Sequence, residues 1–182
     1  KLVREKYRKD FAAIKELLAK EEDYSQFTIS AAILIAHTKH PAGLLFREVE
    51  TLLNEKAKKG AGRDAVAVRL QKRSGVPVET AFKWDEAPRD GKRPWIEELN
   101  ALIAAVSSHS VASGQTFNLR TEERTLLTVF DDSPDLWRAW LTEQLSRGAG
   151  SAGRAPELAG LIAPFFSERK TEALRIARFL AV

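Results

Sequence analysis

Closely spaced basic residues, interrupted by glycine, form the part of the sequence best suited to chemistry with an anion. Residues 54–73 contain seven Lys or Arg against two Asp or Glu, and Gly60 and Gly62 stand among the cations. Residues 1–20 contain seven basic residues against three acidic ones. Such patches are typical of surfaces that meet a nucleotide or a nucleic-acid backbone. The alternative for each patch is a charged helix face exposed to water.

The histidines are the other side chains that could do chemistry, as metal ligands. His37 and His40 lie close together, whereas His109 is far away in the sequence. No carboxylate stands beside the pair at a ligand spacing, and the absence of cysteine excludes thiolate sites and disulfides. We therefore expect packed or solvated histidines and no metal site. No Ser/His/Asp set or G-x-S-x-G motif favours hydrolase chemistry.

The composition is that of a globular protein without a membrane segment. The chain has 182 residues and a formal net charge of +4, and no apolar run reaches the length of a transmembrane helix. The absence of cysteine favours a cytoplasmic location. The sequence contains no methionine, even at position 1, and we therefore expect it to be a piece of a longer protein.

The first half of the chain predicts the order helix, strand, helix, strand, strand. Four apolar residues at helical spacing predict a helix over residues 1–22: Tyr7, Phe11, Ile14 and Leu18. The apolar run 27–37 is rich in β-branched residues, which is typical of a strand buried on both faces. Strands are also predicted over residues 65–73 and 76–84, antiparallel to each other across Ser74-Gly75.

A helix after Pro41 connects the first two of these strands. Its apolar face is predicted to carry Leu45, Val49, Leu52, Leu53 and Lys56. The helix ends in a basic turn followed by glycine, as helix C-termini favour. The unit is therefore strand, helix, strand, with a basic loop where the helix returns to the sheet.

The second half of the chain predicts helices only. The polar residues 85–94 contain prolines and a glycine and indicate a boundary between domains at 1–87 and 88–182. Apolar periodicity predicts helices over residues 95–107, 117–130, 134–148, 156–166 and 168–180.

Two local patterns refine this helical half. Asp131-Asp132-Ser133-Pro134 is typical of a helix cap followed by proline at the first helical position. Residues 148–153 are rich in glycine and serine and predict a flexible connector. The tryptophans on apolar helical faces are expected in the core: Trp95, Trp137 and Trp140.

Four segments in combination resemble a known family: ISAAILIAHTKHP at 29–41, LNEKAK at 53–58, GRDAVAV at 62–68 and LQKRSG at 70–75. They are similar to the second palm domain of the large, polymerase-like subunit of type III-B (Cmr-type) CRISPR effector complexes. The ending, ALRIARFLA at 173–181, is similar to the helical C-terminal domain of that family. The resemblance implies an α+β chain, with a partial ferredoxin-like (GGDEF/palm-type) domain followed by an all-helical C-terminal bundle.

The resemblance also implies cofactors and partners. In that family the assembled complex, guided by CRISPR RNA and activated by target RNA, converts ATP to cyclic oligoadenylates. A Gly-Gly-Asp-Asp motif holds Mg²⁺ there, and this sequence contains no such motif. We therefore expect ATP and Mg²⁺ as cofactors of the full-length protein and no catalytic or metal-binding residue in this chain. The expected partners are other subunits of the effector complex, CRISPR RNA and target RNA, and no membrane.

Three residues are assigned to nucleotide contact by the resemblance. Lys58 and Arg63 match a cyclase pattern in which a lysine and a nearby arginine reach the triphosphate, as a point charge and a bidentate fork. Ser30 matches a Ser-Ala-Gly strand that lines the nucleotide, although Ala32 replaces the glycine here. The alternatives are that Lys58 and Arg63 offset the helix dipole and that the Ser30 hydroxyl is bonded within the sheet.

Two functions follow as candidates. The first is a part of a nucleotide-cyclising palm that contributes phosphate-binding groups to an active site completed elsewhere. The second is a non-catalytic scaffold that contacts RNA and neighbouring subunits. A stand-alone GGDEF-like cyclase is disfavoured because such proteins seldom carry a helical domain like residues 95–182. We expect the first function for the longer protein and no turnover by this chain alone.

Overall fold

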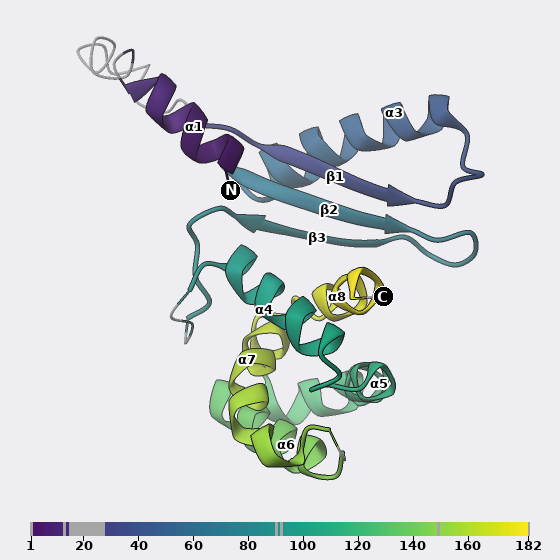
Figure 1. Cartoon of the computed structure of the whole chain (residues 1–182), viewed down its shortest axis with the longest axis vertical. Coiled ribbons are helices and arrows are strands. Elements are labelled where there is room, and N and C mark those ends of the chain that lie inside the picture. The colour runs from purple at the N-terminus through teal and green to yellow at the C-terminus, as the bar shows by residue number, and fades with distance from the viewer. Residues whose placement is uncertain are drawn as a thin grey trace. The chain divides into compact units, whose positions relative to one another are not determined.

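A computed structural model of the chain describes residues 2–12, 14, 28–89, 91, 93–148 and 150–181 (Figure 1). The chain divides into two compact units. The first is made of Lys1–Ser74 and Ala81–Trp84, and the second of Gly75–Thr80 and Asp85–Val182. Strands occur in the first part and helices alone from Trp95 onward, so the predicted α+β fold with a helical C-terminal region is confirmed.

The elements before residue 84 follow the predicted order. They are helix α1 (Leu2–Asp10), strand β1 (Ala31–Ala36), helix α3 (Ala42–Thr51), π-helix η2 (Leu52–Gly60), strand β2 (Ala65–Gln71) and strand β3 (Val78–Lys83). The helix predicted over residues 1–22 is observed as α1, and most of its second half lies outside the described residues. Among the described helices, none is long and apolar enough to cross a membrane.

The three strands form one sheet in the order β1-β2-β3. β1 and β2 are parallel, with Ala31 opposite Val66 and Ala36 opposite Gln71. Figure 1 shows β3 running in the opposite direction to β2, as predicted for a hairpin across Ser74-Gly75. The parallel pair requires a crossover connection, which α3 and η2 provide.

One face of the sheet is lined by alanine, and η2 packs on it. The buried residues of this cluster are Leu52 and Ala57 of η2 with Ala65 and Ala67 of β2. Partly buried residues surround them: Ala32, Leu53, Ala61 and Ala81. Small side chains leave room for the helix backbone to approach the sheet closely, so this contact positions the loop that follows η2.

β1 is not the strand buried on both faces that its apolar run predicts. The residues of β1 are half-buried except for Ile33, which is 48% exposed. β2 is the buried strand instead, with Val66, Val68 and Leu70 at 4% exposure or less. An apolar run rich in β-branched residues does not reveal whether the strand is central in its sheet or at an edge. The pairing places β2 between its neighbours, and β1 is therefore at an edge of the described sheet.

The second half of the crossover helix is a π-helix, whereas the sequence pattern predicts an α-helix throughout. Leu52 and Ala57 are fully buried, five residues apart, which matches the i to i+5 hydrogen bonds of a π-helix. Lys56, expected on the apolar face from α-helical spacing, is exposed. The wider turn carries Ala57 to the sheet in its place.

Within the described residues, the five helices predicted after residue 94 are observed in the predicted order, and a short 3-10 helix is present in addition. They are α4 (Trp95–Ser107), α5 (Ser113–Phe130), α6 (Pro134–Ser146), the short 3-10 helix η3 (Ala152–Arg154), α7 (Ala155–Ser167) and α8 (Glu172–Leu180). α5 begins four residues before the predicted start at 117. α8 begins four residues after the predicted start at 168, since Arg169 has a φ of 55° in the turn that ends α7.

The segment predicted to be a flexible connector at 148–153 is anchored where the structure describes it. Ser151 is fully buried, and its hydroxyl donates to the carbonyl oxygen of Leu145 at the end of α6. Glycine and serine content predicts flexibility only where no side chain finds a partner. Here the serine hydroxyl ties the turn to the preceding helix, and η3 follows immediately.

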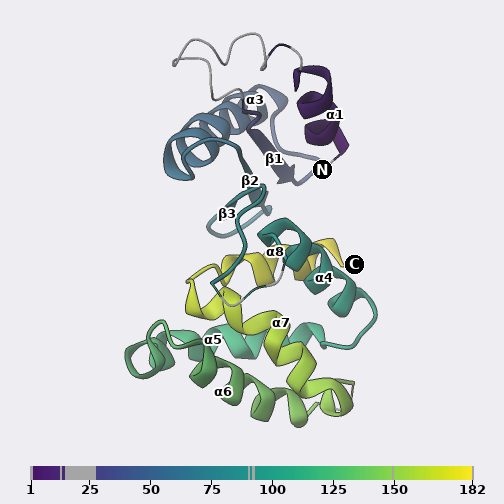
Figure 2. The same cartoon turned by 90° about the vertical axis from the view of Figure 1, so that its left-hand side faces the viewer.

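Aromatic side chains form the core between α6 and α7, which lie side by side in both views (Figures 1 and 2). Trp137 is fully buried, and its ring centroid lies 4.9 Å from that of Phe166. Trp95 is also fully buried and contacts Phe165 edge-on at 5.1 Å. Trp140 was expected in the core but is half-buried.

The Asp131-Asp132 pair is not a side-chain cap of α6. The N-cap is Ser133, which makes no side-chain capping hydrogen bond, and Pro134 occupies the first helical position as predicted. The Asp131 carboxylate is 3.1 Å from the guanidinium of Arg169, and that of Asp132 lies 3.7 Å from Arg89. These carboxylates therefore act in ion pairs, which sequence spacing does not reveal.

Candidate functional site

The predicted site residues Ser30, Lys58 and Arg63 all belong to segments that meet at one end of the sheet. Ser30 lies directly before β1, and Arg63 lies two residues before the start of β2. Because the two strands are parallel and Ala31 is opposite Val66, their starting ends lie side by side. Lys58 is in the last turn of η2, which leads into the same loop.

Backbone hydrogen bonds hold Lys58 and Arg63 close to each other. The backbone amide of Arg63 donates to two carbonyl oxygens, that of Lys58 at 2.9 Å and that of Ala57 at 3.2 Å. The amide of Ala61 donates to Lys56 at 2.8 Å. These bonds satisfy carbonyl groups that a helix end otherwise leaves open, and they fold the loop back over the last turn of η2.

The loop between η2 and β2 adopts an unusual left-handed backbone. The φ angles of Gly62, Arg63 and Asp64 are 77°, 63° and 47°. Glycine tolerates this conformation, but each of the other two residues pays about 1–2 kcal/mol for it. Such strain persists where the surroundings dictate the conformation, and it is concentrated at functional sites.

Trp84 connects the starting ends of β1 and β2. Its indole N–H donates to the carbonyl oxygen of Ile29 at 2.8 Å, next to Ser30. Its backbone amide donates to the carbonyl oxygen of Asp64 at 3.0 Å, next to Arg63. The residue that directly follows the third strand therefore ties together the two segments that carry predicted site residues.

Lys83 is a further basic residue at this end of the sheet, and the sequence pattern did not single it out. A Cβ built on Gly62 would lie 3.7 Å from Cε and 3.8 Å from Nζ of Lys83, so its ammonium group sits beside the loop. The only signal in the sequence is its position before Trp84, at the end of a predicted strand. The pairing of β3 with β2 brings it to Gly62.

The cations here differ in how strongly they are neutralised. Lys59 forms an ion pair with Glu55 at 2.7 Å, whereas Lys58 donates to the neutral Asn54 side chain at 3.2 Å. Arg63 is exposed, and within the described residues it forms no ion pair. Lys58 and Arg63 therefore retain charge that an incoming anion would meet.

Ser30 is half-buried at the start of β1. Among the described residues, no hydrogen-bond partner of its hydroxyl is found, including the sheet partner that the alternative interpretation requires. The hydroxyl is thus able to donate to or accept from a group that approaches this end of the sheet.

The described part of the chain does not supply a magnesium site. It contains no group of three or more His, Cys, Asp or Glu side chains placed to hold a metal ion. Nδ1 of His37 lies 3.2 Å from the amide of Lys39, and Nε2 of His40 lies 3.3 Å from a Glu48 carboxylate oxygen. The Asp131-Asp132 carboxylates are engaged by arginines, as described above.

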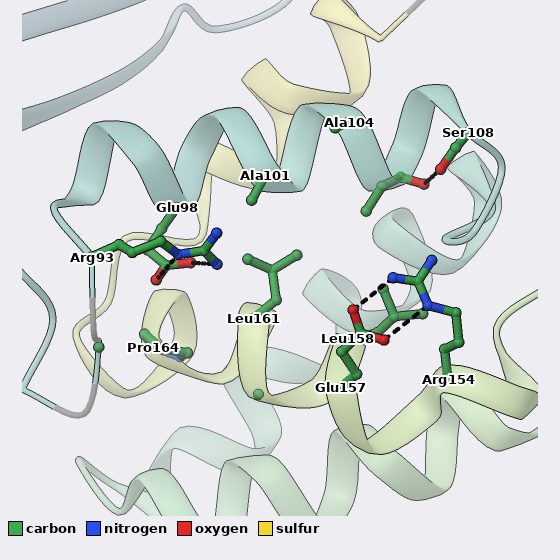
Figure 3. Close-up of a pocket in the computed structure, with 13 residues that line it drawn as sticks. Arg93, Glu98, Ala101, Ala104, Ser108, Arg154, Glu157, Leu158, Leu161 and Pro164 are labelled. Atoms are coloured by element: carbon green, nitrogen blue, oxygen red, sulfur yellow. Dashed lines mark hydrogen bonds and ion pairs between the residues drawn. The ribbon is translucent and has the colours of Figure 1, made fainter.

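A second candidate site is a groove of about 880 Å³ between α4 and α7 (Figure 3). Its middle is apolar, with Ala101 facing Leu161 across the groove in this view. An Arg–Glu pair lies at each end. Nε and Nη2 of Arg93 donate to the two carboxylate oxygens of Glu98, at 3.3 and 3.1 Å.

The pair at the other end of the groove is Arg154 with Glu157, at 2.9 and 2.6 Å. The hydrogen bond from Arg154 lowers the pKa of the Glu157 carboxyl below its usual value. Both arginines of the groove are thus occupied by a carboxylate of this chain. The groove therefore offers shape and apolar surface, but little uncompensated charge for an anionic ligand.

The fold before residue 84, a β-helix-β unit closed by an antiparallel third strand, is that of a palm-type α+β domain. Residues 3–67 match the family model described as Cas10/Cmr2, second palm domain. The chain is also 42% identical over 57 residues to a protein of Pyrococcus furiosus named CRISPR system Cmr subunit Cmr2. That alignment covers 31% of this chain and 6% of the relative. Residues 3–67 are therefore similar to a Cmr2-type second palm domain, and the resemblance predicted from the sequence is confirmed for this segment.

Proposed function

We propose that this chain is part of the large subunit of a cytoplasmic type III-B CRISPR effector complex, and that its palm segment binds the phosphates of ATP. In the full-length protein this binding would serve the synthesis of cyclic oligoadenylates. The observation that carries the proposal is the convergence of Lys58, Arg63 and Lys83 on one loop beside Ser30.

The chemistry of the loop supports a phosphate ligand. A lysine ammonium acts as a point charge, and an arginine guanidinium matches two phosphate oxygens at once. Lys58 has a neutral hydrogen-bond partner, and Arg63 is held in a strained, exposed conformation by two backbone bonds. The loop is thus arranged before a ligand arrives, which reduces the entropy cost of binding.

The test is a titration of ATP with Mg²⁺ into the purified chain at two salt concentrations, by isothermal titration calorimetry. Lys58→Ala and Arg63→Ala are each expected to weaken binding about tenfold, since each removes one charge-assisted contact. Lys83→Ala is expected to weaken ATP binding less, because Lys83 belongs to β3 and not to the loop itself. Binding is expected to fall as the salt concentration rises.

Lys59→Ala is the matched control, because this neighbouring lysine is already paired with Glu55. ATP binding that is insensitive to all of the Lys58, Arg63 and Lys83 substitutions would refute the site assignment. Complete absence of ATP binding, together with retained binding of CRISPR RNA or of neighbouring subunits, would favour the scaffold function instead.

A further inference from the structure

A smaller cavity, of about 270 Å³, lies between α5 and α6 of the helical unit. Its apolar lining consists of the buried Leu119 and Leu145, together with the half-buried Trp140. The Trp140 ring is held edge-on by Trp137 at 5.9 Å and by Phe166 at 6.1 Å. The cavity therefore contains an aromatic surface that is oriented before any ligand binds.

Polar side chains with unused hydrogen-bonding capacity surround this aromatic surface. The amides of Asn118 and Gln144 and the carboxylate of Glu122 line the cavity. Within the part of the chain that the structure describes, these three side chains have no hydrogen-bond or ion-pair partner. Gln115, in contrast, is occupied, because its amide bonds Ser151 and the backbone of Ala112, both at 3.0 Å.

The cation at this cavity is Arg147, at the end of α6. Its Nε and Nη2 share a single oxygen of Glu143, at 3.3 and 3.0 Å, so Nη1 remains for another acceptor. The arrangement is an aromatic wall, amide and carboxylate groups, and a guanidinium. It differs from the groove between α4 and α7, where both arginines are engaged through two nitrogen atoms.

We propose that the cavity between α5 and α6 binds one unpaired nucleobase carried on a ribose phosphate, with the base against Trp140 and the phosphate toward Arg147. Every base has a π-face for stacking and an edge that amides can read, and single-stranded RNA is recognised in this way. The volume is just below the range of about 300–1,000 Å³ for pockets that hold drug-sized ligands, so it suits a base rather than a whole nucleotide. The proposal does not depend on the palm site.

The chemistry of the lining also predicts which bases bind best. The Glu122 carboxylate can only accept hydrogen bonds when it is ionised. It therefore favours bases with an exocyclic amino group, such as cytosine and adenine, over uracil, which presents a carbonyl oxygen at the equivalent position.

The experiment measures quenching of tryptophan fluorescence by short oligo-C, oligo-A and oligo-U RNA and by the corresponding nucleoside monophosphates. We expect quenching with oligo-C and with oligo-A, and weaker quenching with oligo-U. In Trp140→Phe the quenching should disappear, while fluorescence anisotropy of labelled oligo-C still reports binding. If the RNA oligonucleotides bind more tightly than the nucleoside monophosphates, the ligand is a base within an RNA strand. If the two bind with equal affinity per base, the ligand is a free nucleotide.

Three substitutions test the assignment of the polar groups. Gln144→Ala is expected to weaken oligo-C binding about tenfold, and Glu122→Gln to remove most of the preference for cytosine over uracil. Asn100→Ala, at an exposed position of α4 outside the cavity, is the control and should change nothing. Absence of quenching with every probe, or quenching that persists in Trp140→Phe, would overturn the proposal.

Discussion

Trp84 and Ile29 are 55 residues apart in the sequence and are joined by a hydrogen bond of 2.8 Å from the indole N–H to the backbone carbonyl. The same tryptophan donates its backbone amide to Asp64. The residue after the third strand thus joins the starting ends of the first two strands, where Ser30 and Arg63 are located. Trp84 therefore contributes to the geometry of the candidate nucleotide site, together with the backbone bonds between Arg63 and the last turn of η2.

Trp84→Phe is expected to destabilise the chain by about 1–3 kcal/mol. The substitution keeps an aromatic ring but leaves the carbonyl group of Ile29 without its donor. Chemical denaturation followed by circular dichroism measures the change. Trp140→Phe is the matched control, because within the described residues its indole N–H has no partner, and a smaller loss is expected there. Equal losses in the two variants would contradict a special role for the Trp84 bond.

Gly62→Ala is expected to lower the free energy of unfolding by about 1 kcal/mol, because φ at this position is +77°. Gly43→Ala is expected to raise it by about 0.5 kcal/mol, since Gly43 is in α3 and an added Cβ would meet no atom within 4 Å. The two denaturation midpoints should therefore move in opposite directions. An unchanged or raised midpoint in Gly62→Ala would show that the left-handed backbone at this position is not a requirement of the fold.

Arg93→Ala is expected to destabilise the helical unit by about 1–3 kcal/mol, because it leaves the buried Glu98 carboxylate without its guanidinium. Arg154→Ala removes a pair of similar geometry at the other end of the groove, but both of its partners are exposed, and no measurable change is expected. Thermal unfolding of the two variants tests this contrast. Addition of Glu98→Gln to Arg93→Ala should restore part of the loss.

Lys170 predicts a pH dependence of stability. Burial lowers the pKa of its ammonium group below the ordinary value of 10.5, and the nearby Glu86 and Glu168 carboxylates oppose part of that shift. Between the lowered pKa and 10.5 the unfolded chain binds more protons than the folded chain, so the free energy of unfolding rises with pH in this window. Below the lowered pKa, this contribution is constant.

Lys170→Met is expected to remove this rise, because the substituted side chain does not titrate. The measurement is the free energy of unfolding of both proteins at a series of pH values approaching 10.5 from below. The difference between the two proteins cancels the contribution of all other titrating groups. A constant difference across the window would contradict the buried-ammonium explanation.

Much of the local structure followed from the sequence because it depends on neighbours along the chain. Apolar spacing predicted α4 to within its observed ends, and the Ser133-Pro134 pair predicted the start of α6. The basic turn followed by glycine located the loop that carries Lys58 and Arg63. These features are set by the helical period, by capping and by backbone preferences, which act over a few residues.

The features that the sequence did not predict depend on contacts between distant segments. Lys83 reaches Gly62 only because β3 pairs with β2, and Asp131 meets Arg169 only because the turns after α5 and α7 come together. The wide turn of η2 follows from the alanine-lined sheet, on which Leu52 and Ala57 pack five residues apart.

By itself the sequence determined the α+β order of elements, the similarity of the first part to a Cmr2-type palm domain, and a basic loop at the end of the crossover helix. Only the tertiary structure decided that β2 is the central strand, that Trp84 joins the ends of β1 and β2, and that an aromatic cavity with free amides lies between α5 and α6. The physical reason is that secondary structure is governed by local periodicity. Burial and hydrogen bonding between side chains are settled only when remote segments pack.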